Sequence, residues 1–216
     1  PTFSVEFLPI NTAYTWGDTL QVSGKAQTMT LQPMANALVR YSISTNDSFR
    51  GIQDTPIEGV LRTDAHGEFS IPLLLKKHSQ TSTLWRHYYP YFSVSVSIVG
   101  DNGETQTQQL HIPVHQRPTT LDVEVPKVVV KEQLPHLVFR NTNNMSVKID
   151  ERVTVCLYDN RNALVWIQRC PTNTSILLSD WSKLDDGVYR LEAQTPSGGK
   201  VSQECLFISE KSRQLP

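Results

Sequence analysis

Short runs of alternating apolar and polar residues recur along the whole chain, and turn residues separate them. Such period-two alternation predicts β-strands with one buried face, and no apolar stripe of helical period continues beyond two turns. In the first half of the chain the pattern predicts seven strands, the number typical of an immunoglobulin-like sandwich. These strands cover residues 3–7, 19–26, 37–44, 59–63, 67–75, 91–100 and 104–113.

The second half repeats the pattern after a polar, proline-containing stretch at residues 115–119. Such a stretch between two strand series predicts a domain boundary. We therefore expect an all-β protein made of two tandem immunoglobulin-like antiparallel β-sandwich domains, residues 1–116 and 117–216. The second series of strands covers residues 121–125, 137–141, 152–158, 163–169, 175–178, 187–194 and 200–208. Only residues 179–186 predict a helical turn.

Turn chemistry supports these strand boundaries. Residues 64–67 (Asp-Ala-His-Gly) and 101–103 (Asp-Asn-Gly) combine a capping side chain with a glycine that tolerates the left-handed conformation. Phe69, after the first turn, alternates inward and is expected to be a core residue. Residues 91–114 and 188–208 share the order strand, glycine turn and polar strand, which predicts that each domain closes with the same hairpin.

Composition and charge narrow the possible functions. Hydrophobic residues make up 38% and charged residues 19%, which is typical of folded domains. The net charge of -1 and the pI near 6.7 provide no basic field for a phosphate backbone, so we expect no nucleic-acid partner. No apolar run is long enough for a membrane helix and no signal peptide begins the sequence, so we expect a fragment of a longer protein without membrane insertion of its own.

Two histidine-containing clusters are the candidates for metal or acid–base chemistry. Asp64, His66 and Glu68 lie together in sequence, but a turn uses the same residues without a ligand. His111 and His115 have a spacing that joins two ligands on a helix. On a strand, four residues span about 13 Å, too far for two bonds of about 2 Å to one zinc ion. Since esterase, phosphate-loop and zinc-protease motifs do not occur, we expect no enzyme, no cofactor, no metal and no catalytic residue.

All three cysteines, Cys156, Cys170 and Cys205, lie in the second half. An odd and small number favours small buried side chains over a disulfide framework, and a thiol inside an apolar strand is usually inert. If one pair forms, Cys156 with Cys205 is more plausible than Cys156 with Cys170, because simple hairpin pairing about residues 159–162 does not place the latter two opposite each other.

Five aromatic rings occur within residues 85–92. Exposed rings of this kind make protein or sugar contacts, whereas the alternative is that they begin a strand and fill one end of the sandwich or the seam with the second domain. The segment is the candidate interaction surface of a second functional class, a surface adhesin or carbohydrate-binding module. Its candidate residues are Trp85, His87, Tyr88, Tyr89 and Tyr91. Expected core anchors are Trp16, Trp166 and Trp181.

Several segments taken in order resemble a known family. PTFSVEF, AYTWGDTLQVSGKAQT, PMANALVRYSI and GVLRTDAHGEFSIPLLL are similar in order and spacing to a macroglobulin domain of bacterial alpha-2-macroglobulins. TTLDVEVP and LPHLVFRNTNNMSVKIDERVTVCLYD are similar to the macroglobulin domain that follows it. The resemblance covers most of the chain, most strongly residues 1–114, and it implies two consecutive domains, the third and fourth of such a protein.

The resemblance implies a scaffold role. Proteins of this family trap proteases: a bait segment is cut, a thioester is exposed in many members, and macroglobulin domains rearrange around the attacker. This sequence contains neither the thioester signature Cys-x-x-Gln nor a bait loop. The resemblance therefore implies that this part of the protein supplies the framework and not the trigger. The implied partners are neighbouring domains of the same longer chain and, through the full-length protein, a target protease. The implied location is the periplasm or the bacterial cell surface, after export and often with a lipid anchor.

Overall fold

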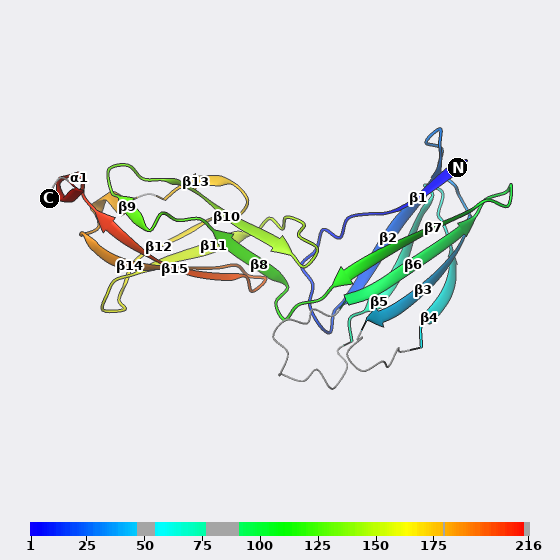
Figure 1. Ribbon diagram of the computed structural model, residues 1–216, viewed down its shortest axis with the longest axis horizontal. Coiled ribbons are helices and arrows are strands. Elements are labelled where there is room, and N and C mark those ends of the chain that lie inside the picture. Colours follow the sequence, from blue (N-terminus) through cyan, green and yellow to red (C-terminus); the bar gives the residue numbers. More distant parts are fainter. Residues whose placement is uncertain (47–54, 77–90, 179, 214–216) are drawn as a thin grey trace. The chain divides into compact units, whose positions relative to one another are not determined.

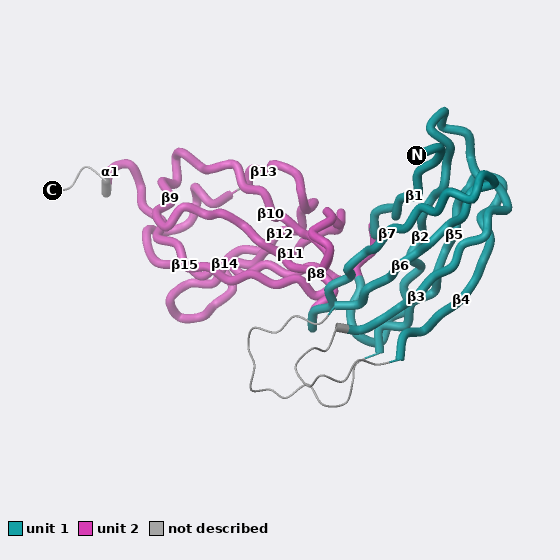
Figure 2. Tube along the Cα trace, turned by 45° about the vertical axis from the view of Figure 1, so that its right-hand side comes forward, with its two compact units in different colours: residues 1–10, 14–116 teal, residues 11–13, 117–216 magenta. Residues whose placement is uncertain are grey.

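The computed structural model describes residues 1–46, 55–76, 91–178 and 180–213 (Figure 1). The chain divides into two compact units (Figure 2). Unit 1 contains Pro1–Ile10 and Tyr14–Gln116, and unit 2 contains Asn11–Ala13 and Arg117–Pro216. Among the described residues, no helix has the length and apolar character needed to cross a membrane.

Unit 1 is a sandwich of two antiparallel sheets, because its strands alternate apolar residues toward a shared interior. One sheet has the order β1-β2-β5 and the other β4-β3-β6-β7. The strands are β1 (Phe3–Phe7), β2 (Thr19–Thr28), β3 (Leu38–Asn46), β4 (Ile57–Arg62), β5 (Glu68–Leu74), β6 (Tyr91–Val99) and β7 (Thr105–Pro113).

The interior of unit 1 is built from alternate residues of both sheets. On β5, Phe69, Ile71 and Leu73 are buried while their neighbours are exposed. Phe69 lies over Gly24 of β2, where a Cβ atom would meet its ring, and it packs edge-on against Phe7 with ring centroids 6.3 Å apart. Phe69 is therefore the core residue that the alternation predicts.

Unit 2 is a second sandwich, with sheets in the orders β13-β10-β8 and β12-β11-β14-β15-β9. Seven of its strands correspond to predicted ones. The eighth, β9, was not predicted, and it pairs in parallel with β15. The elements are β8 (Thr119–Val123), β9 (Val128–Val130), β10 (His136–Asn143), β11 (Arg152–Tyr158), β12 (Leu164–Pro171), β13 (Ser175–Leu177), a 3-10 turn η1 (Trp181–Lys183), β14 (Gly187–Gln194), β15 (Lys200–Ile208) and a short helix α1 (Glu210–Arg213).

The two units repeat one topology. The first, second and fifth strands of unit 1 form one sheet, and β8, β10 and β13 of unit 2 are paired in the corresponding order. The other sheet contains a long hairpin in each unit, β6–β7 and β14–β15, with nine and eight residue pairs, and in unit 2 β9 is added at the edge beside β15. This confirms the predicted fold class, tandem antiparallel β-sandwiches, and the shared closing hairpin.

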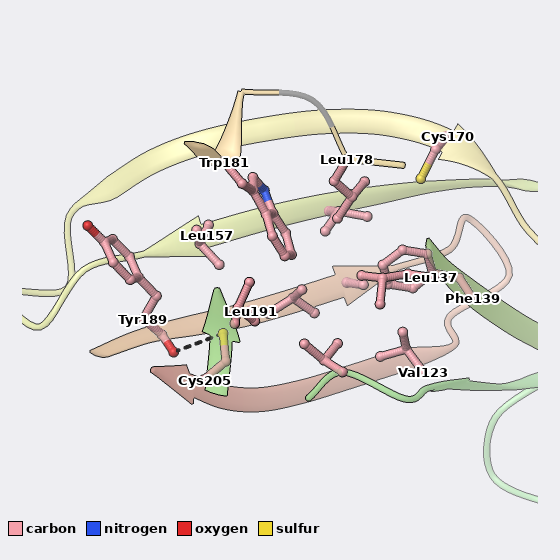
Figure 3. Packing of buried hydrophobic residues seen from close by; sticks show 14 of the residues in the cluster. Val123, Leu137, Phe139, Leu157, Cys170, Leu178, Trp181, Tyr189, Leu191 and Cys205 are labelled. Atoms are coloured by element: carbon pink, nitrogen blue, oxygen red, sulfur yellow. Dashed lines mark hydrogen bonds between the residues drawn. The ribbon is translucent and has the colours of Figure 1, made fainter. Parts of the chain in front are cut away.

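The core of unit 2 is closed by a segment that crosses the gap between its sheets (Figure 3). Leu178 and Trp181 point from this segment into the interior, and the indole of Trp181 lies 5.1 Å from the ring of Phe207 and 5.6 Å from that of Trp166. Trp181 is 1% exposed and is a core anchor as predicted. Trp166 is half-buried against the same cluster, and in unit 1 a half-buried Trp16 packs on Phe92 at 6.1 Å.

Candidate functional site

The polar cluster of Asp64, His66 and Glu68 forms the turn between β4 and β5. Asp64 Oδ1 accepts the backbone N–H groups of His66 at 2.8 Å and Glu68 at 2.9 Å. These bonds, the one from Glu68 foremost, lower the pKa of Asp64. Gly67 adopts φ 74° at the left-handed position. The carboxylate is therefore held by the main chain. Among the described residues, no group of three or more histidine, cysteine or acidic side chains is arranged to bind a metal ion.

The two histidines with i, i+4 spacing contact different groups. His111 lies on β7, and its ring is 4.9 Å from the ring of Tyr91 on the neighbouring strand. The strand ends at Pro113, so His115 lies beyond it, where its carbonyl oxygen accepts a hydrogen bond from Thr15 Oγ1 at 2.8 Å. The strand predicted over residues 104–113 is thus present as β7 (Thr105–Pro113); it carries His111, and His115 follows two residues after its end.

The candidate aromatic surface lies largely outside the described residues. This applies to Trp85, His87, Tyr88 and Tyr89. Tyr91 is the first residue of β6 and is half-buried beside His111. The role of this segment stays a prediction.

All three cysteines are free thiols. Cys170 and Cys205 are buried in the unit 2 core as expected, and burial raises the pKa of Cys205 to about 11 and also raises that of Cys170. Cys156 is only half-buried, which corrects the expectation that it is a core residue. Its neighbours Val155 and Leu157 face the interior, so the strand alternation directs Cys156 to the opposite face, away from Cys205. The plausible Cys156–Cys205 pair is therefore not formed.

The outer face of the five-stranded sheet of unit 2 carries an open groove. The groove has a volume of about 840 Å³ and extends over β11, β14 and β15, with Arg169 of β12 at its margin. Its floor consists of outward-facing residues that alternate with the core residues of the same strands. The residues that line the groove include Arg152, Thr154, Cys156, Arg169, Gln194 and Lys200.

Strand pairing places three cations at one end of this groove. Arg169 is paired with Thr154, Thr154 with Gln194, and Gln194 with Lys200, so these four residues form one row across four strands. Arg152 lies two residues before Thr154 on the same face, which makes Arg152 and Arg169 diagonal neighbours at about 7–8 Å. In the described part of the chain, neither arginine nor Lys200 forms an ion pair.

The carboxylate of the groove is already paired. Glu192 Oε1 accepts a bond of 2.8 Å from Arg190 Nε, and the guanidinium of Arg190 also lies 5.0 Å from the centre of the Tyr158 ring. The pKa of Tyr158 is raised, first by the charge of the Cys156 thiolate form, then by desolvation and by Glu192. The groove thus has a neutral or compensated middle and a cationic end.

A partly buried polar network lies at one end of the unit 2 sandwich. Glu151 Oε2 accepts hydrogen bonds from Ser197 Oγ at 2.6 Å and from Asn141 Nδ2 at 3.2 Å. Ser197 in turn shares a hydrogen bond of 2.6 Å with Thr119. Asn141 is fully buried, and its Oδ1 has no hydrogen-bond partner among the protein atoms described. Polar contacts take the place of apolar packing at this end. They connect β8, β10 and the β14–β15 turn.

The sequence contained only part of the signal for the groove. The alternation of Val153, Val155 and Leu157 indicates which side of β11 faces outward. However, Arg152, Arg169 and Lys200 are dispersed over 49 positions (152 to 200). Only the pairing of β12, β11, β14 and β15 places Arg169 and Lys200 in one row, with Arg152 as a diagonal neighbour. Chemically, the arrangement offers guanidinium and ammonium donors with hydroxyl, amide and thiol groups between them, which is suited to binding an anionic group.

Comparison with known proteins gives matches at the level of solved structures. No protein-family model matches the sequence, and no curated protein matches it. The chain is similar to the native conformation of alpha-2-macroglobulin from E. coli, with 12% identity and a TM-score of 0.42 over 100% of this chain and 16% of that chain. It is similar to Salmonella alpha-2-macroglobulin reacted with methylamine, with 12% identity and a TM-score of 0.42 over 95% of this chain and 16% of that chain.

A further match is a tetra-tandem repeat in the extending region of a large adhesion protein, with 19% identity and a TM-score of 0.33 over 94% of this chain and 48% of that chain. Bacterial alpha-2-macroglobulins, the family that the sequence resembles, are thus among the solved structures to which the chain is similar. The chain spans 16% of the length of each of these two alpha-2-macroglobulins.

Proposed function

We propose that this chain is a non-catalytic framework module, two consecutive macroglobulin-type domains of a longer alpha-2-macroglobulin-like protein that traps proteases. The observation that carries the proposal is the repeated topology: both units have a three-stranded sheet packed on a sheet that contains the same long hairpin. A tandem of one sandwich design is suited to spacing and orienting other domains. The alpha-2-macroglobulin family is proposed because the ordered sequence segments resemble macroglobulin domains.

The polar groups of the chain support a framework role in a second way. The carboxylates that stand out in the sequence accept hydrogen bonds within turns. Asp64 caps the β4–β5 turn, and Asp159 caps the β11–β12 turn by accepting the N–H groups of Arg161 at 2.9 Å and Ala163 at 2.8 Å. Such groups stabilise hairpins and are not presented to a substrate. The neighbouring domains of the longer chain and, through them, a protease are the proposed partners, and the periplasm or cell surface is the proposed location.

The experiment compares the isolated chain with the longer protein. The purified 216-residue chain should leave the activity of trypsin and elastase on a large protein substrate unchanged. Removal of these residues from the longer protein should abolish trapping, measured as protection of that large substrate by the complex. Trapping that continues undiminished without them would contradict the framework proposal.

A matched measurement addresses the adhesin class. Titration of the purified chain with oligosaccharides, followed by tryptophan fluorescence and a glycan array, should give no saturable signal for a framework module. Saturable binding of a sugar that is lost on substitution of Tyr91 and its aromatic neighbours would replace the proposal with a carbohydrate-binding function.

A further inference from the structure

We propose that the cationic end of the unit 2 groove binds an acidic, extended polypeptide segment with two carboxylates four residues apart. The inference concerns this chain alone and does not depend on the parent protein proposed above. It follows from three features of the outer face of the β12-β11-β14-β15-β9 sheet, namely its open groove, its uncompensated cations and their spacing.

The charges of the groove are unbalanced at one end only. Arg152 and Arg169 are like charges held as diagonal neighbours, and their single described contact with each other is a bond of 3.4 Å from Arg152 Nη2 to the Arg169 carbonyl oxygen. Two like charges on diagonal neighbours repel each other. A carboxylate placed between them would be favourable with both, which makes the pair a site for one acidic group.

The spacing of the third cation fits an extended chain. Lys200 lies three strands from Arg169 in the same row, which corresponds to roughly 14 Å at about 4.8 Å per strand. An extended polypeptide advances about 3.3 Å per residue, so two side chains four residues apart project to the same side about 13 Å from each other. One carboxylate can therefore lie at Arg152 and Arg169 while the next lies at Lys200.

The floor between the cations suits a polypeptide. Thr154 and Gln194 occupy the row between Arg169 and Lys200, and they can exchange hydrogen bonds with main-chain amides. The exposed Pro196 adds apolar surface at the same end of the groove. The groove has three cations and one carboxylate that is already paired. Its positive electrostatic potential is therefore too weak to concentrate a densely charged phosphate or sulfate polymer. These features favour an acidic peptide.

The direct test is fluorescence anisotropy with a labelled peptide, Ser-Glu-Val-Ser-Val-Glu-Ser, titrated with the 216-residue chain at low ionic strength. Exposed cation–carboxylate pairs each contribute roughly a factor of 1.5 to 5 in affinity. We expect saturable binding with a Kd of about 10 µM to 1 mM, weakened by added salt. The peptide with glutamine at both acidic positions should bind about tenfold more weakly or not at all.

Variants locate the site. The double variant Arg152→Gln/Arg169→Gln and the single variant Lys200→Gln should each weaken binding, and their combination should weaken it by roughly tenfold or more. Arg161→Gln is the matched control, because Arg161 is exposed in the same unit but does not line the groove. Because all four side chains are exposed, the variants should keep the circular dichroism spectrum of the parent chain.

A second readout uses the thiol on the groove floor. Saturating peptide should slow the alkylation of Cys156 by iodoacetamide in the parent chain and not in the triple variant. The proposal is overturned by any of three results: no saturable binding at low salt, equal binding of the glutamine peptide, or binding unchanged in the triple variant. Binding of a sulfated oligosaccharide in place of the acidic peptide would likewise overturn it.

Discussion

The hydroxyl group of Tyr189 donates a hydrogen bond of 3.0 Å to the carbonyl oxygen of Asp185, four residues upstream. Tyr189, labelled in Figure 3, is the first buried residue of β14. Its ring packs on Phe207 with centroids 5.0 Å apart. This is the arrangement of a tyrosine corner, in which one side chain fixes the entry of the chain into a central strand. Burial, followed by the charge of Asp185, raises the pKa of Tyr189.

Substitution of Tyr189 by phenylalanine should lower the free energy of unfolding of unit 2 by about 0.5–1.5 kcal/mol, because the Asp185 carbonyl loses its donor while the ring packing stays. Urea denaturation followed by tryptophan fluorescence measures this change. Tyr41→Phe, at a hydroxyl group with no hydrogen bond in the described structure, is the control and should change stability by less. Equal effects of the two substitutions would contradict a specific role for the corner.

Truncation of Phe69 to alanine should destabilise unit 1 by roughly 3–5 kcal/mol, since the ring is fully enclosed over Gly24 and beside Phe7. The measurement is the shift in the denaturation midpoint of the purified chain. Leu74→Ala on the exposed side of the same strand is the matched control. A loss below about 1 kcal/mol at Phe69 would show that the ring does not fill the core.

Two turns of the same type allow the effect of backbone conformation on stability to be measured apart from that of side-chain contacts. Gly67 has φ 74°, and a Cβ atom there would meet the Ala26 carbonyl oxygen and lie 3.0 Å from the backbone nitrogen of Met34. The equivalent position of the β11–β12 turn is Asn162, with φ 63°. Gly67→Ala should therefore destabilise by about 1–3 kcal/mol, and Asn162→Gly should be within about 0.5 kcal/mol of the parent. Thermal unfolding of both variants tests the pair, and the reverse order of effects would refute it.

Glu104 connects the stability of unit 1 to pH. Hydrogen bonds from the Thr2 hydroxyl group at 2.6 Å and the Thr2 backbone nitrogen at 2.8 Å, with a further one from Gln106, lower the pKa of Glu104 to about 2. A carboxyl group with a folded-state pKa below its unfolded value of about 4.3 stabilises the fold above that pH. Its contribution is lost as the pH falls from about 4.3 to about 2.

The variant Glu104→Gln should therefore unfold with a weaker dependence on pH between about 4.3 and 2 than the parent chain. Thermal unfolding at a series of pH values measures this dependence. Glu58→Gln, at another exposed carboxylate of unit 1, controls for the loss of one charge. Parallel pH curves for the parent chain and Glu104→Gln would disprove the linkage.

The three thiols should differ in reactivity. Iodoacetamide at neutral pH should modify Cys156 in the native protein, because it lies half-exposed on the groove floor. Cys205 should stay unmodified, because its thiol is buried and its pKa is about 11; Cys170 is buried and should also be protected. Peptide mass spectrometry before and after unfolding in urea distinguishes the sites. Modification of Cys205 at the rate of Cys156 in the native protein would contradict this assignment.

The alternation of residues such as Phe69, Ile71 and Leu73 was sufficient to predict the strands, and the Asp-x-x-Gly turn at residues 64–67 was sufficient to predict where they reverse. Both signals are local, since a side-chain period of two and a capping carboxylate act within a few residues. Local signals likewise predicted the helical turn around Trp181. They missed β9, because three valines beside Pro126 and Lys127 become a strand only through their partner β15.

The sequence by itself therefore determined that the chain forms two layered β-sandwiches and where most strands begin and end. Tertiary structure alone decided which residues meet across strands: the row from Arg169 to Lys200, the outward position of Cys156 and the Asn141–Glu151–Ser197 hydrogen-bond network. The physical reason is that alternation defines two faces of a strand, whereas the identity of its neighbours depends on pairing between segments that are far apart in the chain.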